Sequence, residues 1–315
     1  MTEQPRWVDA TTLRHAVSAD RARRLIRQAL ADGLDPSADP ARLAVPAGDG
    51  QLLVMPSASR RAAGVKVASV APGNPARGLE RIQALYVLFD AATLTPSAVL
   101  DGAALTTLRT PAVSAVAIDC LAAQELSHVV IIGSGPQAVG HAEAILAIRS
   151  PTSITVVGRE VERARSAANR IRGLAGSPRA EALAVADGAA VEEAVREAAV
   201  IVTATSAATP VIDGDWVADG ACVVAIGSHE PDRRELDSDL VGRSLVVVED
   251  IGTAQREAGD VVLAVADGRL DWTDVGTLAD LVLGRRQRAT DRPNVFKGVG
   301  MAWQDLVVAE HVTRI

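Results

Sequence analysis

The sequence predicts an α/β protein with two parts: a doubly wound parallel sheet in the carboxy-terminal half and a smaller α+β domain before it. Three observations support this prediction. Short apolar runs alternate with helical patterns after residue 127, a glycine-rich turn follows the first of these runs, and 315 residues exceed the usual length of one domain. We expect one domain over 1–115, a second over 116–297, and a terminal segment, 298–315, that folds back on the first.

The amino-terminal part begins with an amphipathic pattern. Residues 8–31 repeat small and apolar side chains at helical spacing, with arginines on the opposite face, and this predicts one helix. The strands expected after a proline-rich loop are 52–55, 64–70, 82–90 and 97–100. A turn over 91–96 joins the last two, and a long helix rich in small residues is expected over 103–125.

The second part repeats the order strand, helix, strand. Its expected strands are 128–132, 154–157, 182–185, 200–204, 221–226 and 245–248. A helix over 137–148 follows the first strand, and the tail over 299–313 is also expected to be helical. Strands that alternate with helices are typical of a parallel sheet with helices on both faces.

The turn after residue 132 has the pattern Gly-x-Gly-x-x-Ala. Gly133 and Gly135 permit a tight turn and close approach of the backbone to a pyrophosphate, and Ala138 is the third small position. Pro136 suits the first helical position, so the free amides beside Gln137 can point at an anion. With a strand before it and a helix after it, the pattern predicts a Rossmann dinucleotide site; a purely structural glycine turn is the alternative.

The end of the next strand indicates which dinucleotide binds. An acidic residue there usually bonds the ribose hydroxyls of NAD, but this chain has Gly158 and then Arg159, which favours NADPH, with NADH possible. In the alternative interpretation Arg159 is a solvated residue at the start of a helix and Glu160 binds the ribose. Further cofactor contacts are expected where two later strands end, and these are Ala204, Thr205 and Ile226.

Composition restricts the partners. A formal net charge of −7 without a basic tract does not favour nucleic acid or an anionic membrane, and the amino-terminal stretch lacks a secretory apolar region, so a cytoplasmic protein is expected. Cys120 and Cys222 are expected to be small apolar residues, neither a disulfide nor a redox pair. The five histidines show no metal-ligand spacing, and no metal is predicted.

Lysine usage indicates a site in the first part. Of the 32 basic side chains only Lys66 and Lys297 are lysines. Lys66 lies mid-strand, where alternation puts it on one face with Ala68 and Val70. An ammonium on an otherwise apolar face needs a carboxylate or a ligand anion as its partner. The alternative is an edge-strand lysine that prevents aggregation.

Many short segments resemble the ornithine cyclodeaminase/μ-crystallin family over nearly the whole chain. They are Pro40-Ala41-Arg42, Val54-Met55-Pro56, Gly64-Val65-Lys66-Val67, Leu88-Phe89-Asp90, Asp101-Gly102, Leu108-Arg109-Thr110-Pro111-Ala112, Gly133-Ser134-Gly135-Pro136-Gln137-Ala138, Ala225-Ile226-Gly227-Ser228, Arg234-Glu235-Leu236-Asp237, Val248-Glu249-Asp250 and Val295-Phe296-Lys297-Gly298-Val299-Gly300. The resemblance implies a homodimer paired through the amino-terminal domains, a Rossmann domain for NAD(H) or NADP(H), and a substrate cleft.

The resemblance also implies roles for single residues. By matching position Arg42, Lys66 and Arg109 bind the substrate carboxylate, and Thr110 helps to hold the cofactor. Arginine can bind a carboxylate through two parallel N–H bonds, so three such cations can orient an α-amino or α-imino acid. Without the family, Arg109 could equally be a helix arginine whose head reaches solvent.

Two departures from the cyclodeaminase pattern narrow the expected activity. The glutamate that recognises the distal amine of ornithine is matched by Leu53, and the catalytic aspartate is matched by His229. The pattern after Ser228 is more similar to that of the ketimine reductases and pyrroline-carboxylate reductases. His229, with an ordinary pKa of roughly 6.5, is a candidate proton donor; a loop histidine that bonds the backbone or the nicotinamide amide is the alternative.

The resulting hypothesis is an oxidoreductase that reduces the C=N bond of an α-imino acid, such as Δ1-pyrroline-2-carboxylate or Δ1-piperideine-2-carboxylate, to an L-amino acid. Three alternatives stay open: an alanine-type amino-acid dehydrogenase, ornithine cyclodeaminase, and a non-enzymatic NADPH-binding protein similar to μ-crystallin. The three cations argue against the last, because a binding protein needs no carboxylate clamp, whereas an apolar pocket lined by Leu53 and Trp303 would support it.

Overall fold

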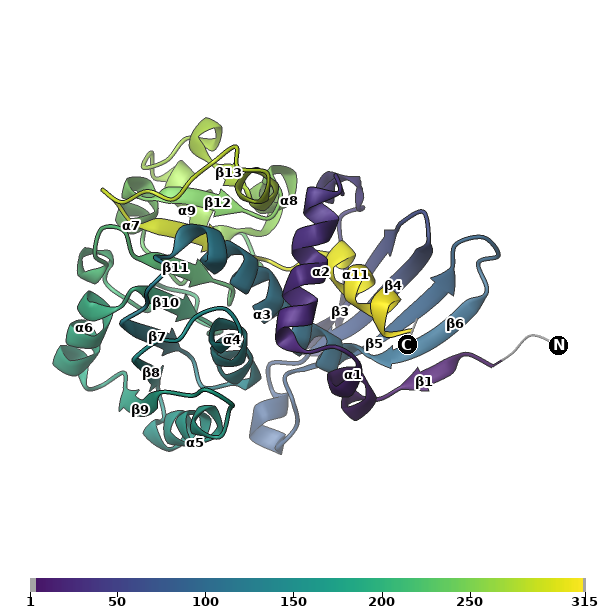
Figure 1. Cartoon of the computed structure of the whole chain (residues 1–315), viewed down its shortest axis with the longest axis horizontal. Coiled ribbons are helices and arrows are strands. Elements are labelled where there is room, and N and C mark those ends of the chain that lie inside the picture. Colours follow the sequence, from purple (N-terminus) through teal and green to yellow (C-terminus); the bar gives the residue numbers. More distant parts are fainter. Residues whose placement is uncertain (1–3, 314–315) are drawn as a thin grey trace. The chain divides into compact units, whose positions relative to one another are not determined.

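The computed structural model describes residues 4–313, and the outermost residues of the two predicted terminal ranges, 1–3 and 314–315, lie outside the described part. Its chain forms two compact units (Figure 1). The first consists of Met1–Thr110 and Met301–Ile315, and the second of Pro111–Gly300. The α/β class and the parallel doubly wound sheet predicted from the sequence are confirmed.

The first unit is built on a six-stranded sheet. Its strands, in spatial order, are β1 (Arg6–Val8), β6 (Pro96–Asp101), β5 (Ile82–Asp90), β4 (Ala62–Val70), β3 (Gly50–Ala58) and β2 (Leu43–Ala47). All neighbours are antiparallel except β1 and β6. The prediction missed β1 and β2, because β1 is only three residues long and the exposed strand β2 contains Pro46.

The predicted helix over 8–31 is wrong, because the structure has two helices there. α1 (Ala10–Ala16) ends where Val17 turns extended, and α2 (Ala19–Ala31) begins after Ser18, whose side chain accepts a hydrogen bond from the Arg21 N–H. A serine followed by helical residues is a strong N-cap, and here it outweighs the continuous apolar pattern. The tail helix α11 (Ala302–Val312) packs on α2, β3 and β4.

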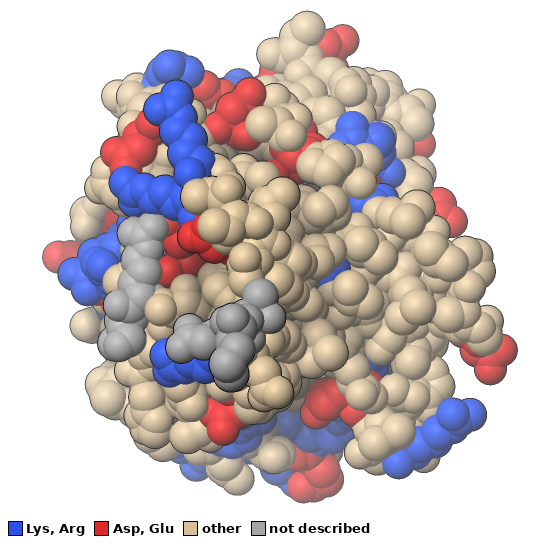
Figure 2. All heavy atoms as spheres, turned by 90° about the vertical axis from the view of Figure 1, so that its right-hand side faces the viewer, with Lys and Arg blue, Asp and Glu red and all other residues tan. Residues whose placement is uncertain are grey.

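The two faces of this sheet differ in exposure. The inner face carries α11, and its side chains, such as Leu53, Met55 and Tyr86, are buried. The outer face is apolar and exposed, and its residues include Trp7, Leu43, Leu52, Val67 and Leu85. Figure 2, which views the side on which this sheet lies in Figure 1, shows a broad area with few charged side chains. The outer face thus exposes several large apolar side chains on neighbouring strands.

The second unit is an eight-stranded, all-parallel sheet. Its spatial order is β13 (Gly276–Thr277), β12 (Leu245–Val248), β14 (Asn294–Lys297), β11 (Cys222–Ala225), β10 (Val200–Thr203), β7 (His128–Ile132), β8 (Ser153–Gly158) and β9 (Arg179–Ala184). The central strand β14 was not predicted. It begins with Asn294 and ends with Lys297, two polar residues that are nevertheless fully buried, so the apolar run between them is too short to indicate a strand.

Helices cover both faces of the second sheet (Figure 1). The α-helices not yet given are α3 (Gly102–Leu121), α4 (Pro136–Leu146), α5 (Val161–Arg172), α6 (Gly188–Glu197), α7 (Ser238–Arg243), α8 (Ile251–Glu257), α9 (Gly259–Ala266) and α10 (Leu278–Val282). Short 3₁₀ helices are η1 (Pro36–Ala38), η2 (Asn74–Arg77), η3 (Gly214–Trp216) and η4 (Trp272–Asp274). Within residues 4–313, no helix combines the length and apolar character needed to span a bilayer.

Candidate functional site

One edge of the second sheet collects the carboxyl ends of its parallel strands. The backbone register places the last residues of five strands, Val248, Lys297, Ala225, Thr203 and Ile132, in one row with Val157, the next-to-last residue of β8. From β7 the chain goes first to β8 and β9 on one side, then to β10 and β11 on the other. The strand order therefore reverses between β7 and β10, which is where ligands bind in open α/β sheets.

The glycine-rich turn lies at this reversal point. Gly133 has a φ of +127°, and a Cβ there would collide with the carbonyl oxygen of Ala204, so only glycine fits. Gly135 is the N-cap of α4, and a Cβ at Gly135 would meet nothing within 4 Å. Within the described residues no side chain caps α4, so no protein side chain occupies the position from which a ligand could accept bonds from its first amides. The turn therefore fits a pyrophosphate group.

Helix α4 is held firmly behind that turn. Ala138 is fully buried, and His141 bonds the Gln137 carbonyl oxygen through Nδ1 at 2.8 Å and Ser114 Oγ through Nε2 at 2.9 Å. Burial lowers the pKa of His141 to about 4, so the ring is neutral at physiological pH. No described residue donates to the buried Oε1 of Gln137, which leaves this atom able to accept a bond from a ligand.

The other expected cofactor residues lie at the same edge. Gly158 is buried at the end of β8, while Arg159 and Glu160 are exposed, and Glu160 pairs only loosely with Arg163 at 3.8 Å. Ala204 and Thr205 follow β10 and Ile226 follows β11, and all three are half-buried. The structure thus brings every predicted cofactor residue except Thr110 to one sheet edge.

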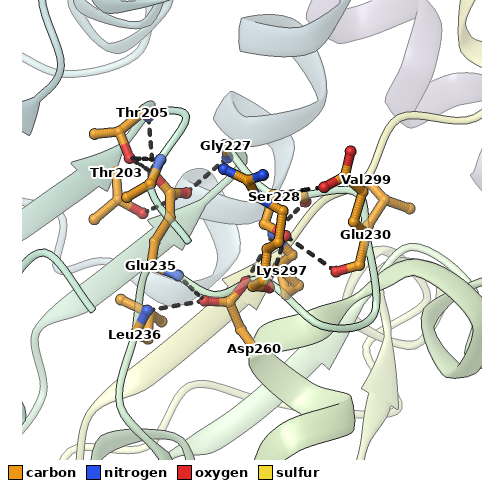
Figure 3. Close-up of polar contacts among 12 residues, drawn as sticks. Thr203, Thr205, Gly227, Ser228, Glu230, Glu235, Leu236, Asp260, Lys297 and Val299 are labelled. Carbon is orange, nitrogen blue, oxygen red and sulfur yellow. Dashed lines mark hydrogen bonds and ion pairs between the residues drawn. The ribbon is translucent and has the colours of Figure 1, made fainter. Parts of the chain in front are cut away.

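A buried polar network lies under the loops after β10 and β11 (Figure 3). Its centre is the Glu235 carboxylate, which accepts bonds from the Thr203 hydroxyl, the Thr205 N–H and hydroxyl, and the Gly227 N–H, all between 2.7 and 3.0 Å. Asp260 accepts from the N–H groups of Glu235 and Leu236 at 2.7 and 2.9 Å. No pattern in the sequence indicated this network.

Lys297 completes the network. Its Nζ lies 2.9 Å from Asp260 Oδ2 and donates to the Ser228 carbonyl oxygen at 2.7 Å. Lys297, Asp260 and Glu235 are all 0–1% exposed. Burial raises the pKa of Glu235, while the Lys297 charge and the bonds from Thr205 act in the opposite direction.

The first unit contains a second buried polar cluster, around Lys66. Lys66 lies on β4, which is flanked by β3 and β5, so the edge-strand interpretation is wrong. Its ammonium is 2.7 Å from Asp305 Oδ2, and Thr106 Oγ1 lies 3.4 Å away. The anionic partner that the buried lysine requires is therefore Asp305 of helix α11.

Arg109 lies beside Lys66 on the same carboxylate. It is 5% exposed, its Nε donates to Asp305 Oδ1 at 3.3 Å, and one terminal nitrogen donates to Gln304 Oε1 at 3.0 Å. Its head is thus buried and does not reach solvent. Burial first, and then the charges of Arg109 and Arg42, lower the pKa of Lys66 to about 8 against the opposing effect of Asp305. Arg42, which is half-buried, therefore belongs to the same cluster.

Asp305 and Gln304 are the residues that sequence reasoning missed here. Both are fully buried in a helix that is otherwise apolar from Met301 to Ala309. Two buried polar residues in such a run are costly unless they have partners, and this was the available signal. Leu53, the residue that replaces the expected glutamate, packs with Ala68 and Val70 in an apolar cluster.

The predicted site residues fall into two groups. Arg42, Lys66, Arg109 and Thr110 belong to the first unit, and Thr110 lies half-buried one residue after Arg109 on α3. The expected cofactor residues other than Thr110, together with His229, belong to the second unit, where His229 is half-buried in the loop after β11. Cys222 is buried, which raises its thiol pKa to about 12, and Cys120 is half-buried; no disulfide joins them in the described part.

Comparison with known proteins agrees with this architecture. The chain is 39% identical over 270 residues to a Δ1-pyrroline-2-carboxylate reductase of Burkholderia ambifaria, and the matched region covers 85% of this chain and 81% of that protein. It is 38% identical over 270 residues to a Δ1-pyrroline-2-carboxylate/Δ1-piperideine-2-carboxylate reductase of Azospirillum brasilense, with the same coverage.

A solved structure is also similar. It is the Δ1-pyrroline-2-carboxylate reductase of Thermococcus litoralis in complex with NADH and L-proline, with a TM-score of 0.90, 26% identity, and coverage of 98% of this chain and 96% of that one. The model of the ornithine cyclodeaminase/mu-crystallin family matches residues 12–314. The chain therefore belongs to the ornithine cyclodeaminase/mu-crystallin family.

Proposed function

We propose that this protein is an NAD(P)H-dependent reductase that converts an α-imino acid, such as Δ1-pyrroline-2-carboxylate or Δ1-piperideine-2-carboxylate, into the corresponding L-amino acid. The observation that carries the proposal is the pairing of Lys66 and Arg109 with the single carboxylate of Asp305, with Arg42 near enough for its charge to act on Lys66. The reductases of Burkholderia ambifaria and Azospirillum brasilense support the same reaction by their similarity.

The cluster is suited to bind the substrate carboxylate. Asp305 contacts Lys66 with one oxygen and Arg109 with the other, and so holds the two cations side by side. The mutual repulsion of the cations is relieved when a second carboxylate binds, because the first compensates only part of their charge. Arg42 would complete the clamp and fix the α-carbon of the imino acid.

Reduction of a C=N bond needs a hydride at carbon and a proton at nitrogen. The reduced nicotinamide supplies the hydride when the coenzyme is bound at the edge that contains Gly133 and Gly135. The chain's own residues supply orientation and charge, because an iminium is already a good hydride acceptor. For the proton we propose His229, which is half-buried in the loop after β11.

We further propose that NADPH is preferred over NADH. Arg159 is exposed at the end of β8, the position from which a cation can meet a 2′-phosphate, and small Gly158 precedes it. A Cβ at Gly158 would lie 3.2 Å from the Ala164 Cβ and 3.5 Å from the Ser134 Cβ, so this turn is already tightly packed. Arg159→Ala should raise the Kd of NADPH about tenfold and leave that of NADH within about twofold.

The outer face of the first sheet supports a homodimer. Trp7, Val99, Val87 and Val65 form one register row across β1, β6, β5 and β4, so the apolar surface is continuous over four strands. A second copy of the chain offers the matching apolar face. Val67→Glu places a charge in the centre of this surface. We expect a dimer for the unaltered protein and a monomer for the variant in light scattering; two dimers would remove this part of the proposal.

The activity is tested by following oxidation of NADPH and NADH spectrophotometrically with a panel of cyclic and open-chain imino acids. We expect turnover with the cyclic substrates and a loss of about 100-fold or more in Lys66→Ala, because its buried cation has no substitute. Arg61→Ala, an exposed arginine next to β4, is the matched control. Unchanged rates in Lys66→Ala would remove the clamp, and turnover of pyruvate with ammonia alone would indicate an amino-acid dehydrogenase instead.

A further inference from the structure

The buried network around Glu235 has no role in the function proposed above. Lys297 is the second of the two lysines in the chain, and it is buried as completely as the first. Its position explains the choice of lysine, since a compact ammonium at the end of β14 reaches both Asp260 and the Ser228 carbonyl oxygen. The buried charges of Glu235, Asp260 and Lys297 therefore need a structural explanation.

The Glu235 carboxylate connects two separate loops. Oε1 accepts both bonds from Thr205, which follows β10, and Oε2 accepts the bond from Gly227, which follows β11. The loops approach so closely that a Cβ at Gly227 would collide with the Thr205 carbonyl oxygen and with Glu235 itself. Figure 3 shows the carboxylate between the two loops. Its four accepted bonds fix the distance between them.

Asp260 and Lys297 fix the carboxylate in turn. Asp260 binds the backbone N–H groups of Glu235 and Leu236, and Lys297 binds Asp260. Lys297 also holds the Ser228 carbonyl oxygen, while the Ser228 hydroxyl donates to the Arg233 carbonyl oxygen at 2.7 Å. The loop between Gly227 and Glu235, which contains His229, is therefore tied at both ends.

These two loops lie beside the reversal point, on the side opposite β8. A dinucleotide spans that point, with its pyrophosphate at the glycine turn and its adenosine ribose at the end of β8. The other half must then extend toward the ends of β10 and β11, where Thr205 and Ile226 lie. This step rests on the proposed coenzyme site and does not depend on the identity of the imino acid.

We propose that Glu235 is a positioning residue for the nicotinamide half of the coenzyme. It acts through the loops after β10 and β11 and does not touch the coenzyme, because it is fully buried and all its acceptor positions face protein donors. Asp260 and Lys297 hold Glu235 in the orientation that this requires. Within the described residues no hydrogen bond joins the turn from Gly133 to Ala138 to the Glu235 carboxylate, so we expect the pyrophosphate turn to respond less to Glu235 than the two loops do.

The test compares two ligands in Glu235→Gln. A glutamine presents an N–H₂ group where a carboxylate oxygen accepted, so it faces either the Thr205 donors or the Thr203 and Gly227 donors unfavourably. We expect the Kd of NADPH to rise about tenfold or more, while the Kd of 2′-phospho-ADP-ribose, which lacks the nicotinamide, changes less than about twofold. Both constants are measured by calorimetry on the full chain.

A second variant and a control guard against a general loss of structure. Thr203→Val removes one donor to Glu235 at a residue that is 0% exposed, and a smaller rise for NADPH alone is expected. The control is Asp237→Asn. Its carboxylate caps α7 and accepts a bond from the Gly214 N–H, which lies before β11, so both Kd values should stay within about twofold. Equal weakening of both ligands in Glu235→Gln, or no weakening of either, would overturn the proposal. Because no imino acid is present, a failed reductase assay would leave this result intact.

Discussion

The two lysines of this chain occupy sites that look alike and differ in the balance of charge. Lys66 and Lys297 are 2% and 1% exposed, and each forms an ion pair below 3 Å with a fully buried aspartate. Around Lys66 two arginines act together with one aspartate. Around Lys297 the aspartate is joined by Glu235, whose pKa is raised by burial against the opposing effect of the Lys297 charge.

The difference in charge balance indicates the role of each cluster. An excess of positive charge at Lys66 is stabilised best by an additional anion, so the site in the first unit is suited to a ligand. The second cluster already gives each acceptor of Glu235 a donor from the protein, so it is suited to hold loops in place. Four predictions test this contrast.

The largest effect is expected on stability at Lys297. Lys297→Met leaves two buried carboxylates without their cation, and the free energy of unfolding should fall by about 3–5 kcal/mol. Urea denaturation followed by circular dichroism measures this. Arg285→Met, at an exposed arginine of the same unit, is the control and should change the value by less than about 0.5 kcal/mol. A similarly small loss in Lys297→Met would mean that the network is not what stabilises this unit.

The corresponding change at the other cluster should act on catalysis. Asp305→Asn keeps the shape but removes the charge that holds Lys66 and Arg109 together, and kcat/KM for the imino acid should fall about 100-fold. Steady-state kinetics measure this loss. The Kd of NADPH is measured in parallel and should change less than about twofold. Asp49→Asn, at an exposed turn, serves as the control. A loss confined to coenzyme binding would contradict the assignment of this cluster to the substrate.

The third prediction concerns pH. Burial lowers the pKa of Lys66 to about 8, so its charge is lost as the pH rises through that value. Tyr86, the register partner of Lys66 on β5, has its pKa raised well above 10 by burial and by Asp305, and stays neutral there. Binding of pyrrole-2-carboxylate should weaken as the pH rises above about 8.

The Lys66 contribution to the free energy of unfolding changes with pH in the direction opposite to ligand binding. The unfolded lysine has a pKa of 10.5 and binds more protons than the folded one between about 8 and 10.5, so this group's contribution to the free energy of unfolding rises with pH across that window. Lys66→Met should abolish the pH dependence of pyrrole-2-carboxylate binding above pH 8. If the variant keeps the full dependence, another group is responsible.

The smallest effect is expected from Arg109→Lys. The charge is kept, but Arg109 binds Asp305 through Nε and Gln304 through a terminal nitrogen of one rigid plane, and a lysine has only a single nitrogen. We expect kcat/KM to fall about fivefold to tenfold, mainly through KM for the imino acid, since the orientation of the carboxylate is loosened. A change larger than that in Asp305→Asn would reverse the proposed ranking within the cluster.

Local patterns account for what the sequence predicted. The turn at Gly133 and the buried strand residue Lys66 could be identified because each is recognisable from its neighbours along the chain. Strand β14 and the acceptors Asp305, Glu235 and Asp260 could not. Each case involves buried polar residues, and their burial is favourable only with partners far away in the sequence. No periodicity reveals such partners.

Helix α11 has a consequence for how the protein is made. Asp305, the counter-ion of Lys66, is translated 239 residues later, after the entire second unit has been synthesised. Without Asp305, the Lys66 ammonium faces the Thr106 hydroxyl and the charges of two arginines but not its carboxylate partner, so burying it in the first sheet is costly. The pairing of Lys66 with Asp305 should therefore form late in folding, only after helix α11 has been synthesised.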